Sequence, residues 1–466
     1  MTLVSQWVRF AIQLAAYVVL ARLLSPEEFG IVAMVTVVVT FAAIFADLGL
    51  SLAALQAQTL RREERSNLFW LNAGAGLACA LVVIALSPVL GVFYNSIEVV
   101  AVSAVLAVPL FLNALAVQFR VELMRDARFS ALAAQEIAAS FAGLVLAVLS
   151  ALAGWSYWAL VVQTLTQSVL ILVIVLGQTR WRPSWPKRTG TMGRLVGFGR
   201  DTLALQLAYM ISRGVDQLII GRVLGADALG YYSRGSQLVS MAFQQVLSPL
   251  TRVVLPKISR AEPADFHRQI ELIHRGVCVT VVSLLGLIIA VSPPAVLVIL
   301  GREWTDMAAV VQVLGAAAVF QAVAYIYYWA FLAKARTGVL FWSELPGRLL
   351  MIGGSIAFAR YGILAVAVSI LAGQLLMWLL GAYFSRRYVG LESGKLLRIS
   401  AGAVAWTMVP TLSTLILSRV LTQSGVPPLG VLLVAGGAWV ALWGAAHLSS
   451  ARRRATLVNL IRAVIK

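Results

Sequence analysis

The sequence predicts an all-α polytopic membrane protein made of two similar halves. Of its 466 residues, 61% are hydrophobic and only 12% are charged. A soluble domain lies nearer to half apolar and a quarter charged. The apolar runs are continuous and do not alternate with polar residues, which favours helices over the strands of a membrane barrel. A weak internal repeat relates the two halves.

Fourteen apolar segments follow one another along the chain. Most of them reach the length of about 20 residues that a helix needs to cross the hydrocarbon core. They run over 3–21, 31–55, 67–92, 99–119, 131–153, 157–177, 200–221, 229–256, 276–300, 306–332, 338–359, 362–384, 399–418 and 428–448.

The repeat joins two stretches that are about 200 residues apart. ARLLSPEEFG at 21–30 matches GRVLGADALG at 221–230, with Arg22 opposite Arg222 and Gly30 opposite Gly230. Each stretch connects two long apolar segments at the same place in its half. Internal repeats of this kind build many transporters, in which two bundles enclose a site that opens to alternate membrane faces. The matches are few, so chance similarity between two membrane loops is the alternative.

Basic residues predict the orientation. Of the 37 Lys and Arg residues, 27 lie in the loops after even-numbered segments or in the C-terminal tail, and five lie in the loops after odd-numbered segments. This places the even loops and both termini in the cytoplasm. The net charge of +18 is therefore explained by basic cytoplasmic loops of a membrane protein, and no nucleic-acid partner is expected. The first segment is expected to be an uncleaved anchor.

The longest loop and the C-terminal tail complete the predicted organisation. Residues 178–199 are predicted to form a cytoplasmic linker, and 449–466 a basic amphipathic tail on the anionic inner leaflet. The bundle before the linker would cover 1–177 and the bundle after it 200–384.

Charges inside the apolar segments form the candidate site. A charge at the centre of a membrane helix costs roughly 2.5–3.5 kcal/mol on insertion scales, so such residues face one another or a water-filled cavity. The predicted substrate-binding residues are Arg9, Arg213, Arg234 and Arg348, and the predicted coupling or charge-pairing residues are Asp47, Asp216 and Glu344.

The spacing along the sequence pairs some of these residues and gives others no partner on the same helix. Arg213 and Asp216 are three apart and Glu344 and Arg348 four apart, so each pair shares a helix face. Each pair lines a cavity or is a neutralising ion pair in the packing. Asp47 has no partner on its own segment, and it either pairs with an arginine of another helix or carries a coupling proton.

Two arginines lie close to segment ends. Arg234 is a gate residue or an interface anchor, and Arg9 lines the cavity or extends to the membrane surface.

Several chemistries have no support in the sequence. There is no GxxxxGK[ST] phosphate loop and no metal-ligand spacing of the three histidines, and Cys79 and Cys278 lie within apolar runs. No loop is long enough for a soluble catalytic domain. We therefore expect neither an enzyme nor a cofactor. The residues alone indicate a secondary transporter of an anionic or amphipathic substrate.

Three stretches carry a family resemblance that extends over nearly the whole chain. ARLLSPEEFGIVAM and FADLGLSLAALQ in 21–56, GVDQLIIGRVLGADALGYYSRGSQL at 214–238 and SPLTRVVLPKISR at 248–260 resemble the Wzx-type polysaccharide flippases. These belong to the multidrug/oligosaccharidyl-lipid/polysaccharide exporter superfamily, and the sequence is most similar to their colanic-acid exporter branch. The resemblance also implies a basic lead-in before Ser5, which this sequence lacks, so the start is expected to be late.

The resemblance implies a fold, a substrate and partners. The fold is two pseudo-symmetric six-helix bundles plus two additional C-terminal helices in 385–448, in the bacterial inner (plasma) membrane. The implied substrate is an undecaprenyl-pyrophosphate-linked oligosaccharide repeat unit, moved from the inner to the outer leaflet by alternating access. Membrane lipids, a coupling cation (proton or sodium) and the polysaccharide polymerase and chain-length machinery are the implied partners.

Three other functions stay open at this point. A lipid II flippase shares the architecture, a multidrug or cation exporter would need a net acidic cavity, and a membrane polysaccharide polymerase or ligase would need a long external loop.

Overall fold

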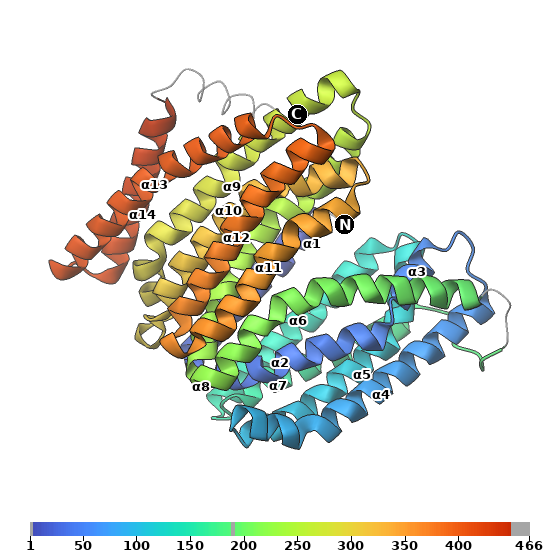
Figure 1. Cartoon of the computed structure of the whole chain (residues 1–466). Helices are drawn as coiled ribbons and strands as arrows, with labels where there is room; N and C mark the ends of the chain where they lie inside the picture. The colour runs from blue at the N-terminus through green and yellow to red at the C-terminus, as the bar shows by residue number, and fades with distance from the viewer. Residues whose placement is uncertain (1–2, 188–191, 449–466) are drawn as a thin grey trace. The chain divides into compact units, whose positions relative to one another are not determined.

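The computed structural model describes residues 3–187 and 192–448, and the regular structure in this part of the chain is helical. Contacts divide the chain into two compact units, Met1–Gly230 and Tyr231–Lys466. We refer to them as the N-terminal and C-terminal units (Figure 1). The predicted tail at 449–466 and residues 188–191 of the predicted linker lie outside the described residues. The predicted bundle boundaries at 177, 199 and 384 stay a prediction.

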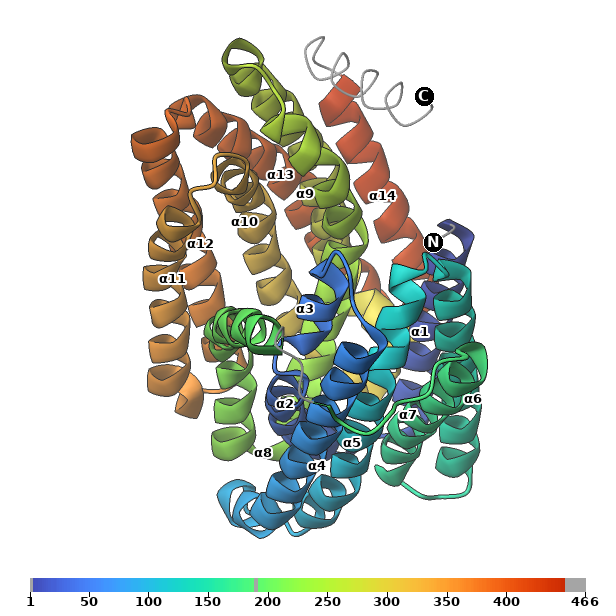
Figure 2. The ribbon, with the colours of Figure 1, turned by 90° about the vertical axis from the view of Figure 1, so that its right-hand side faces the viewer.

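The helices of the N-terminal unit follow the predicted segments closely. They are α1 (Leu3–Leu23), α2 (Pro26–Asp47), the short α3 (Leu50–Gln56), α4 (Arg62–Tyr94), α5 (Glu98–Arg125), α6 (Phe129–Leu152), α7 (Trp158–Gln178) and the first part of α8 (Met192–Ser259). In this unit α5 packs against α2, α4 and α7, and α6 packs against α1 and α7. Figure 2 shows α4 and α5 side by side, and α6 beside α7.

The C-terminal unit contains the rest of α8 and six further helices. They are α9 (Pro263–Ile299), α10 (Met307–Ala333), α11 (Thr337–Phe358), α12 (Ile363–Val389), α13 (Ser393–Gln423) and α14 (Pro428–Leu448).

Hydroxyl groups attach the last two helices to α9. The Trp443 indole donates to Ser283 Oγ at 2.7 Å, and Thr411 Oγ1 donates to the Gly286 carbonyl at 3.2 Å. The buried His274 ring places Nε2 2.7 Å from Ser400 Oγ. Interhelical hydrogen bonds of this kind hold helices together where lipid offers no hydrophobic driving force.

The chain is a multi-pass membrane protein. Among the described residues, eleven helices have the length and composition to cross a membrane, with Gly214–Ser259 counted as one of them. The label α8 covers two helices that meet at a kink, where Gly225 has non-helical φ/ψ angles (φ 86°), and the two predicted segments, 200–221 and 229–256, lie on either side of it. Helices α1 and α11 fall outside the set of eleven. In α11, Glu344 and Arg348 lower the mean hydropathy.

The first repeat stretch begins α2 with a complete capping box. Ser25 Oγ accepts from the Glu28 amide, and the Glu28 carboxylate accepts from the Ser25 amide at 2.6 Å, with Pro26 at the first helical position. These groups satisfy amides that a helix start leaves without partners. The Ser156 hydroxyl, from the turn before α7, donates to the same carboxylate. One acidic side chain therefore fixes both the start of α2 and the turn before α7.

The predicted segment 31–55 is broken where α2 ends. Leu48 and Gly49 have φ values of 52° and 68°, and this left-handed pair separates Asp47 from α3. The left-handed region is costly for a residue with a side chain and is readily adopted by glycine. The break makes Asp47 the last residue of α2.

The two copies of the repeat pack against each other reciprocally within the N-terminal unit. A Cβ atom at Gly30 would lie 1.8 Å from the Ala226 carbonyl oxygen, and one at Gly230 would lie 1.8 Å from the Pro26 carbonyl oxygen. Gly30 corresponds to Gly230 in the repeat, and Pro26 to Ala226. Small residues let helix backbones approach this closely. The reciprocal contact is evidence that the repeat is structural and not a chance similarity.

Replacing Gly30 or Gly230 with alanine should destabilise the protein, because the new methyl group overlaps a backbone carbonyl that cannot move aside without shifting a helix. Overpacking of this kind costs about 1–3 kcal/mol or more. The thermal unfolding of the full chain in detergent measures the effect. Gly74→Ala on α4 is the matched control, because the space around Gly74 is open. Equal melting temperatures for Gly30→Ala and the unmodified chain would contradict the packing argument.

Candidate functional site

The N-terminal unit contains an open-sided cavity of about 500 Å³ among its helices. Its wall combines apolar side chains with a small set of polar groups, which is the usual composition of a ligand site. The lining residues come from α2, α3, α4, α5 and α7, namely Val39, Ala43, Ala46, Asp47, Ser51, Leu52, Leu55, Asn72, Pro109, Leu110, Asn113, Ala114, Val117, Arg120, Val121, Met124 and Thr164.

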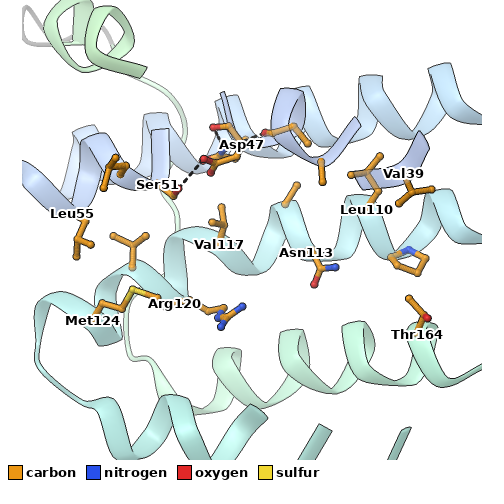
Figure 3. Close-up of a pocket in the computed structure, with 17 residues that line it drawn as sticks. Val39, Asp47, Ser51, Leu55, Leu110, Asn113, Val117, Arg120, Met124 and Thr164 are labelled. Carbon is orange, nitrogen blue, oxygen red and sulfur yellow. Dashed lines mark hydrogen bonds between the residues drawn. The ribbon is translucent and has the colours of Figure 1, made fainter. Parts of the chain in front are cut away.

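One face of α5 supplies the largest share of the wall. Asn113, Val117, Arg120 and Met124 recur at intervals of three or four residues, so they lie on one stripe of the helix. Figure 3 shows them on one ribbon, with Asp47 and Ser51 on the ribbon above. The predicted segment 99–119 left Arg120 in the following loop. That assignment to a loop was wrong, because α5 continues to Arg125.

Asp47, predicted as a coupling or pairing residue, lies in this cavity. Ser51 Oγ, one turn further along in α3, donates to Asp47 Oδ2 at 2.8 Å. The other carboxylate oxygen is buried, and none of the described residues forms a hydrogen bond with it. The described partner of this carboxylate is therefore a hydroxyl group. Pairing with an arginine and coupling to a proton both stay predictions.

A buried amide network supports the backbone next to Asp47. Asn72 is fully buried, and its Nδ2 donates to the Asp47 carbonyl at 3.0 Å and the Ala46 carbonyl at 3.3 Å. Gln118 Nε2 in turn donates to Asn72 Oδ1 at 2.7 Å. The network satisfies carbonyls at the end of α2 that have no partner within the helix. It connects α2 to α4 and α5 across the unit.

Three charged side chains meet beside the cavity. Arg9 of α1 donates to Glu136 Oε2 at 2.5 Å, and Arg120 of α5 donates to Glu136 Oε1 at 2.5 Å. The side chains are 45%, 29% and 18% exposed for Arg9, Arg120 and Glu136 respectively. Each oxygen of one carboxylate is thus held by a different arginine. We call this set the Arg9–Glu136–Arg120 cluster, and its formal charge is +1.

Two other arginines near the cavity hold the fold together. Arg125 donates to the carbonyls of Ala54 and Ala57 at 2.8 and 2.6 Å, which caps the end of α3. Arg65 forms a 2.8 Å ion pair with Glu122 and so joins α4 to α5. Both keep the polar end of the cavity in a fixed shape.

In the C-terminal unit the structure brings one predicted pair into contact. Arg348 donates to Glu344 Oε2 through a terminal nitrogen at 2.6 Å and through Nε at 3.3 Å, one turn apart on α11. Arg234 of α8 donates to Gln237 Oε1 at 2.7 Å. Substrate binding by Arg348 and Arg234 stays a prediction.

The other predicted pair lies partly outside what is described. The side chain of Arg213 is not among the described residues, and Asp216 is half-buried on α8. Pairing of Arg213 with Asp216 therefore stays a prediction.

Arg120 and Glu136 were not among the predicted site residues. The predicted segment ended at 119 and so left Arg120 in the following loop. A signal was present, since Asn113 and Arg120 are seven residues apart and so share a helix face. The meeting of α1, α5 and α6 is a tertiary contact, which no local spacing encodes.

The fold is similar to those of solved membrane transporters. An inward closed conformation of the lipid II flippase MurJ matches with a TM-score of 0.76 at 12% identity, covering 99% of each chain. An inward-facing multidrug resistance MATE family transporter of the MOP superfamily matches with a TM-score of 0.65 at 13% identity, covering 84% of this chain and 96% of that one. At these identities the likeness shows the fold alone.

The chain belongs to the polysaccharide biosynthesis protein family, whose model matches residues 19–309. It is 25% identical to the teichuronic acid biosynthesis protein TuaB of Bacillus subtilis (strain 168), covering 85% of both chains. It is 27% identical to the succinoglycan biosynthesis transport protein ExoT of Rhizobium meliloti (strain 1021), covering 73% of this chain and 72% of ExoT. The lipopolysaccharide biosynthesis protein WzxC of Escherichia coli (strain K12) is 22% identical over 79% of this chain and 75% of its own.

Proposed function

We propose that this protein moves an undecaprenyl-pyrophosphate-linked oligosaccharide from the cytoplasmic to the outer leaflet of the bacterial inner membrane. Family membership and the names of the relatives, which concern teichuronic acid, succinoglycan and lipopolysaccharide, support a polysaccharide precursor as cargo. The observation that carries the proposal is the cavity in the N-terminal unit, where Arg120 brings a cation among membrane helices. Transport without catalysis is part of the proposal.

The cargo sets the physical problem. A pyrophosphate group is strongly hydrated, and taking a charge out of water without a partner costs far more than a protein fold can supply. Guanidinium groups bind phosphate oxygens through paired hydrogen bonds and are more weakly hydrated than ammonium groups. Arginines that face a cavity between membrane helices would replace that hydration, while the polyprenyl tail stays in the lipid.

We assign the predicted residues to roles on this basis. Arg9, Arg213, Arg234 and Arg348 are proposed to contact the anionic head in different states of an alternating-access cycle. Asp216 and Glu344 are proposed to hold arginines while the site is empty, and Asp47 to bind the coupling cation, a proton or sodium. The loop charges support cytoplasmic termini, and the polymerase and chain-length machinery are proposed to take over the translocated unit.

A deletion strain tests the function. We expect undecaprenyl-pyrophosphate oligosaccharide to accumulate, detected by mass spectrometry, while the surface polysaccharide is lost and a plasmid copy restores both. The accumulated units should resist an external glycan-modifying enzyme because they remain inside. Accumulated units that the enzyme reaches would indicate a polymerase, and normal lipids with a normal surface glycan would contradict the proposal.

Arg348→Ala should reduce surface polysaccharide in the complemented strain by roughly tenfold or more, since a charge-assisted phosphate contact contributes about 1.5–3 kcal/mol. The swapped double variant Glu344→Arg/Arg348→Glu is the matched control, because it keeps the ion pair and moves the guanidinium by one turn. Membrane abundance of both variants should equal that of the unmodified chain. Full activity of the swapped variant would mean that the pair only neutralises charge, which removes Arg348 from the site.

Asp47→Asn should abolish the dependence of transport on a proton gradient, because asparagine keeps the size of the side chain and the acceptor for Ser51 but cannot ionise. Translocation of a fluorescent polyprenyl pyrophosphate in proteoliposomes, with and without an imposed gradient, measures this. Ser51→Ala is the control, since it leaves the carboxylate in place. Unchanged stimulation in Asp47→Asn would show that Asp47 is not the coupling group, and a sodium gradient in the same assay tests the other cation.

A further inference from the structure

The Arg9–Glu136–Arg120 cluster holds an anion that is part of the protein itself. Two guanidinium groups from different helices converge on the two oxygens of a single carboxylate. This is the arrangement that paired guanidinium forks offer to a phosphate group. Glu136 therefore occupies the position in which an external anion with several oxygens would fit.

The cluster can be reached, and its hydrogen bonding is incomplete. Arg120 is one of the residues that line the cavity, and its side chain is 29% exposed. Its Nε is buried, and no described residue accepts a hydrogen bond from it. A guanidinium carries five N–H donors in a planar fork, and the described contacts of Arg120 engage only one terminal nitrogen. Donors thus remain for a second acceptor that enters through the cavity.

The pairing of the charges favours exchange over simple addition. The formal charge of the cluster is +1 in both cases, so exchange changes only which groups are paired. While Glu136 binds both arginines, an incoming phosphate would have to share Arg120 with a like-charged carboxylate. If the carboxylate releases Arg120 and stays with Arg9, the phosphate gains a guanidinium and Glu136 keeps a partner, so no arginine or carboxylate of the cluster is left without one.

We propose that Arg120 is a phosphate-binding residue of the N-terminal unit and that Glu136 is the internal anion which the phosphate of the cargo displaces. Arg9 holds Glu136 while Arg120 binds the phosphate, and its own proposed contact with the anionic head belongs to another state of the cycle. The inference rests on the proposed function for the identity of the cargo. Its chemistry is a phosphate-ester or pyrophosphate anion, whether lipid-linked or free.

Another carboxylate in this chain provides a matched control. Glu271 also accepts from two cations, Arg275 at 2.8 Å and Lys395 at 2.6 Å, and its side chain is 22% exposed. It does not line the cavity of the N-terminal unit. Glu136→Gln and Glu271→Gln therefore make the same change in charge and shape, and they differ in whether the freed cations face that cavity.

The test uses the purified full chain in nanodiscs with inorganic pyrophosphate and farnesyl pyrophosphate as probes. Glu136→Gln should lower the melting temperature, because two arginines lose their partner, and added pyrophosphate should restore it. It should also bind the probe roughly tenfold more tightly than the unmodified chain, because the competing carboxylate is gone. Arg120→Gln should bind roughly 10- to 100-fold more weakly, as expected for lost charge-assisted hydrogen bonds. Glu271→Gln should bind like the unmodified chain.

The outcomes separate the sources of the anion. Binding of both probes, or of farnesyl pyrophosphate alone, supports a lipid-linked phosphate, whereas binding of inorganic pyrophosphate alone would overturn that assignment and indicate a free anion. Equal affinity of Glu136→Gln and the unmodified chain would overturn the exchange. If Arg120→Gln does not fold, the double variant Arg120→Gln/Glu136→Gln removes both charges, and probe binding by it at full affinity would also overturn the proposal.

The experiments distinguish failure of the phosphate-site proposal from failure of the proposed function. If Arg120→Gln restores surface polysaccharide in the deletion strain, the cargo assignment stands and Arg120 is not its phosphate contact. If the deletion strain has no lipid phenotype, the proposed function fails whatever the binding results are.

Discussion

A charge among membrane helices must have a partner, and the architecture of the N-terminal unit reflects this constraint. Glu136 binds Arg9 and Arg120 and so connects α1, α5 and α6 at one point. Asp47, the last residue of α2, takes Ser51 of α3 as its partner across the break between the two helices. Because each of these groups is costly without its partner, the helices that supply them cannot shift independently. The polar contacts around the cavity therefore also fix the shape of the cavity.

The reciprocal contact of the repeat applies a steric constraint of a different kind. Gly30 and Gly230 each approach a backbone carbonyl of the other copy, so any side chain there would force the helices apart. Duplicated sequences fold into similar structures, and two similar surfaces that meet face to face exchange equivalent contacts. The residues that the two copies share, an arginine, a leucine and a glycine at equal spacing, include the glycine that this contact requires. The weak repeat in the sequence therefore includes residues that form a tertiary contact between its two copies.

Much of the fold could be predicted from the sequence, and less of the site. Apolar runs and loop charges depend on the solvent around each segment, so they locate the helices one by one. The run 31–55 concealed a break because Leu48, a residue that rarely adopts φ of 52°, takes the left-handed conformation beside Gly49. The pair Glu344 and Arg348 could be predicted since it lies within one helix, whereas Arg120 and Glu136 meet across helices. Because the predicted segment ended at 119, Arg120 was placed in a loop, although its side chain lines the wall of the cavity.

A carboxylate that competes for the same arginines is useful to a transporter in a way that it would not be to a receptor. A carrier must bind its cargo well enough to offset desolvation and still release it on the other side, so very tight binding would stop the cycle. An internal anion lowers the net affinity by the free energy of the ion pair that the cargo breaks. The same anion offers the arginine a partner at the moment the cargo leaves, which avoids an uncompensated charge on the return step. The energy difference between the loaded and empty cavity then stays small, and a modest gradient is enough to bias the equilibrium between its states.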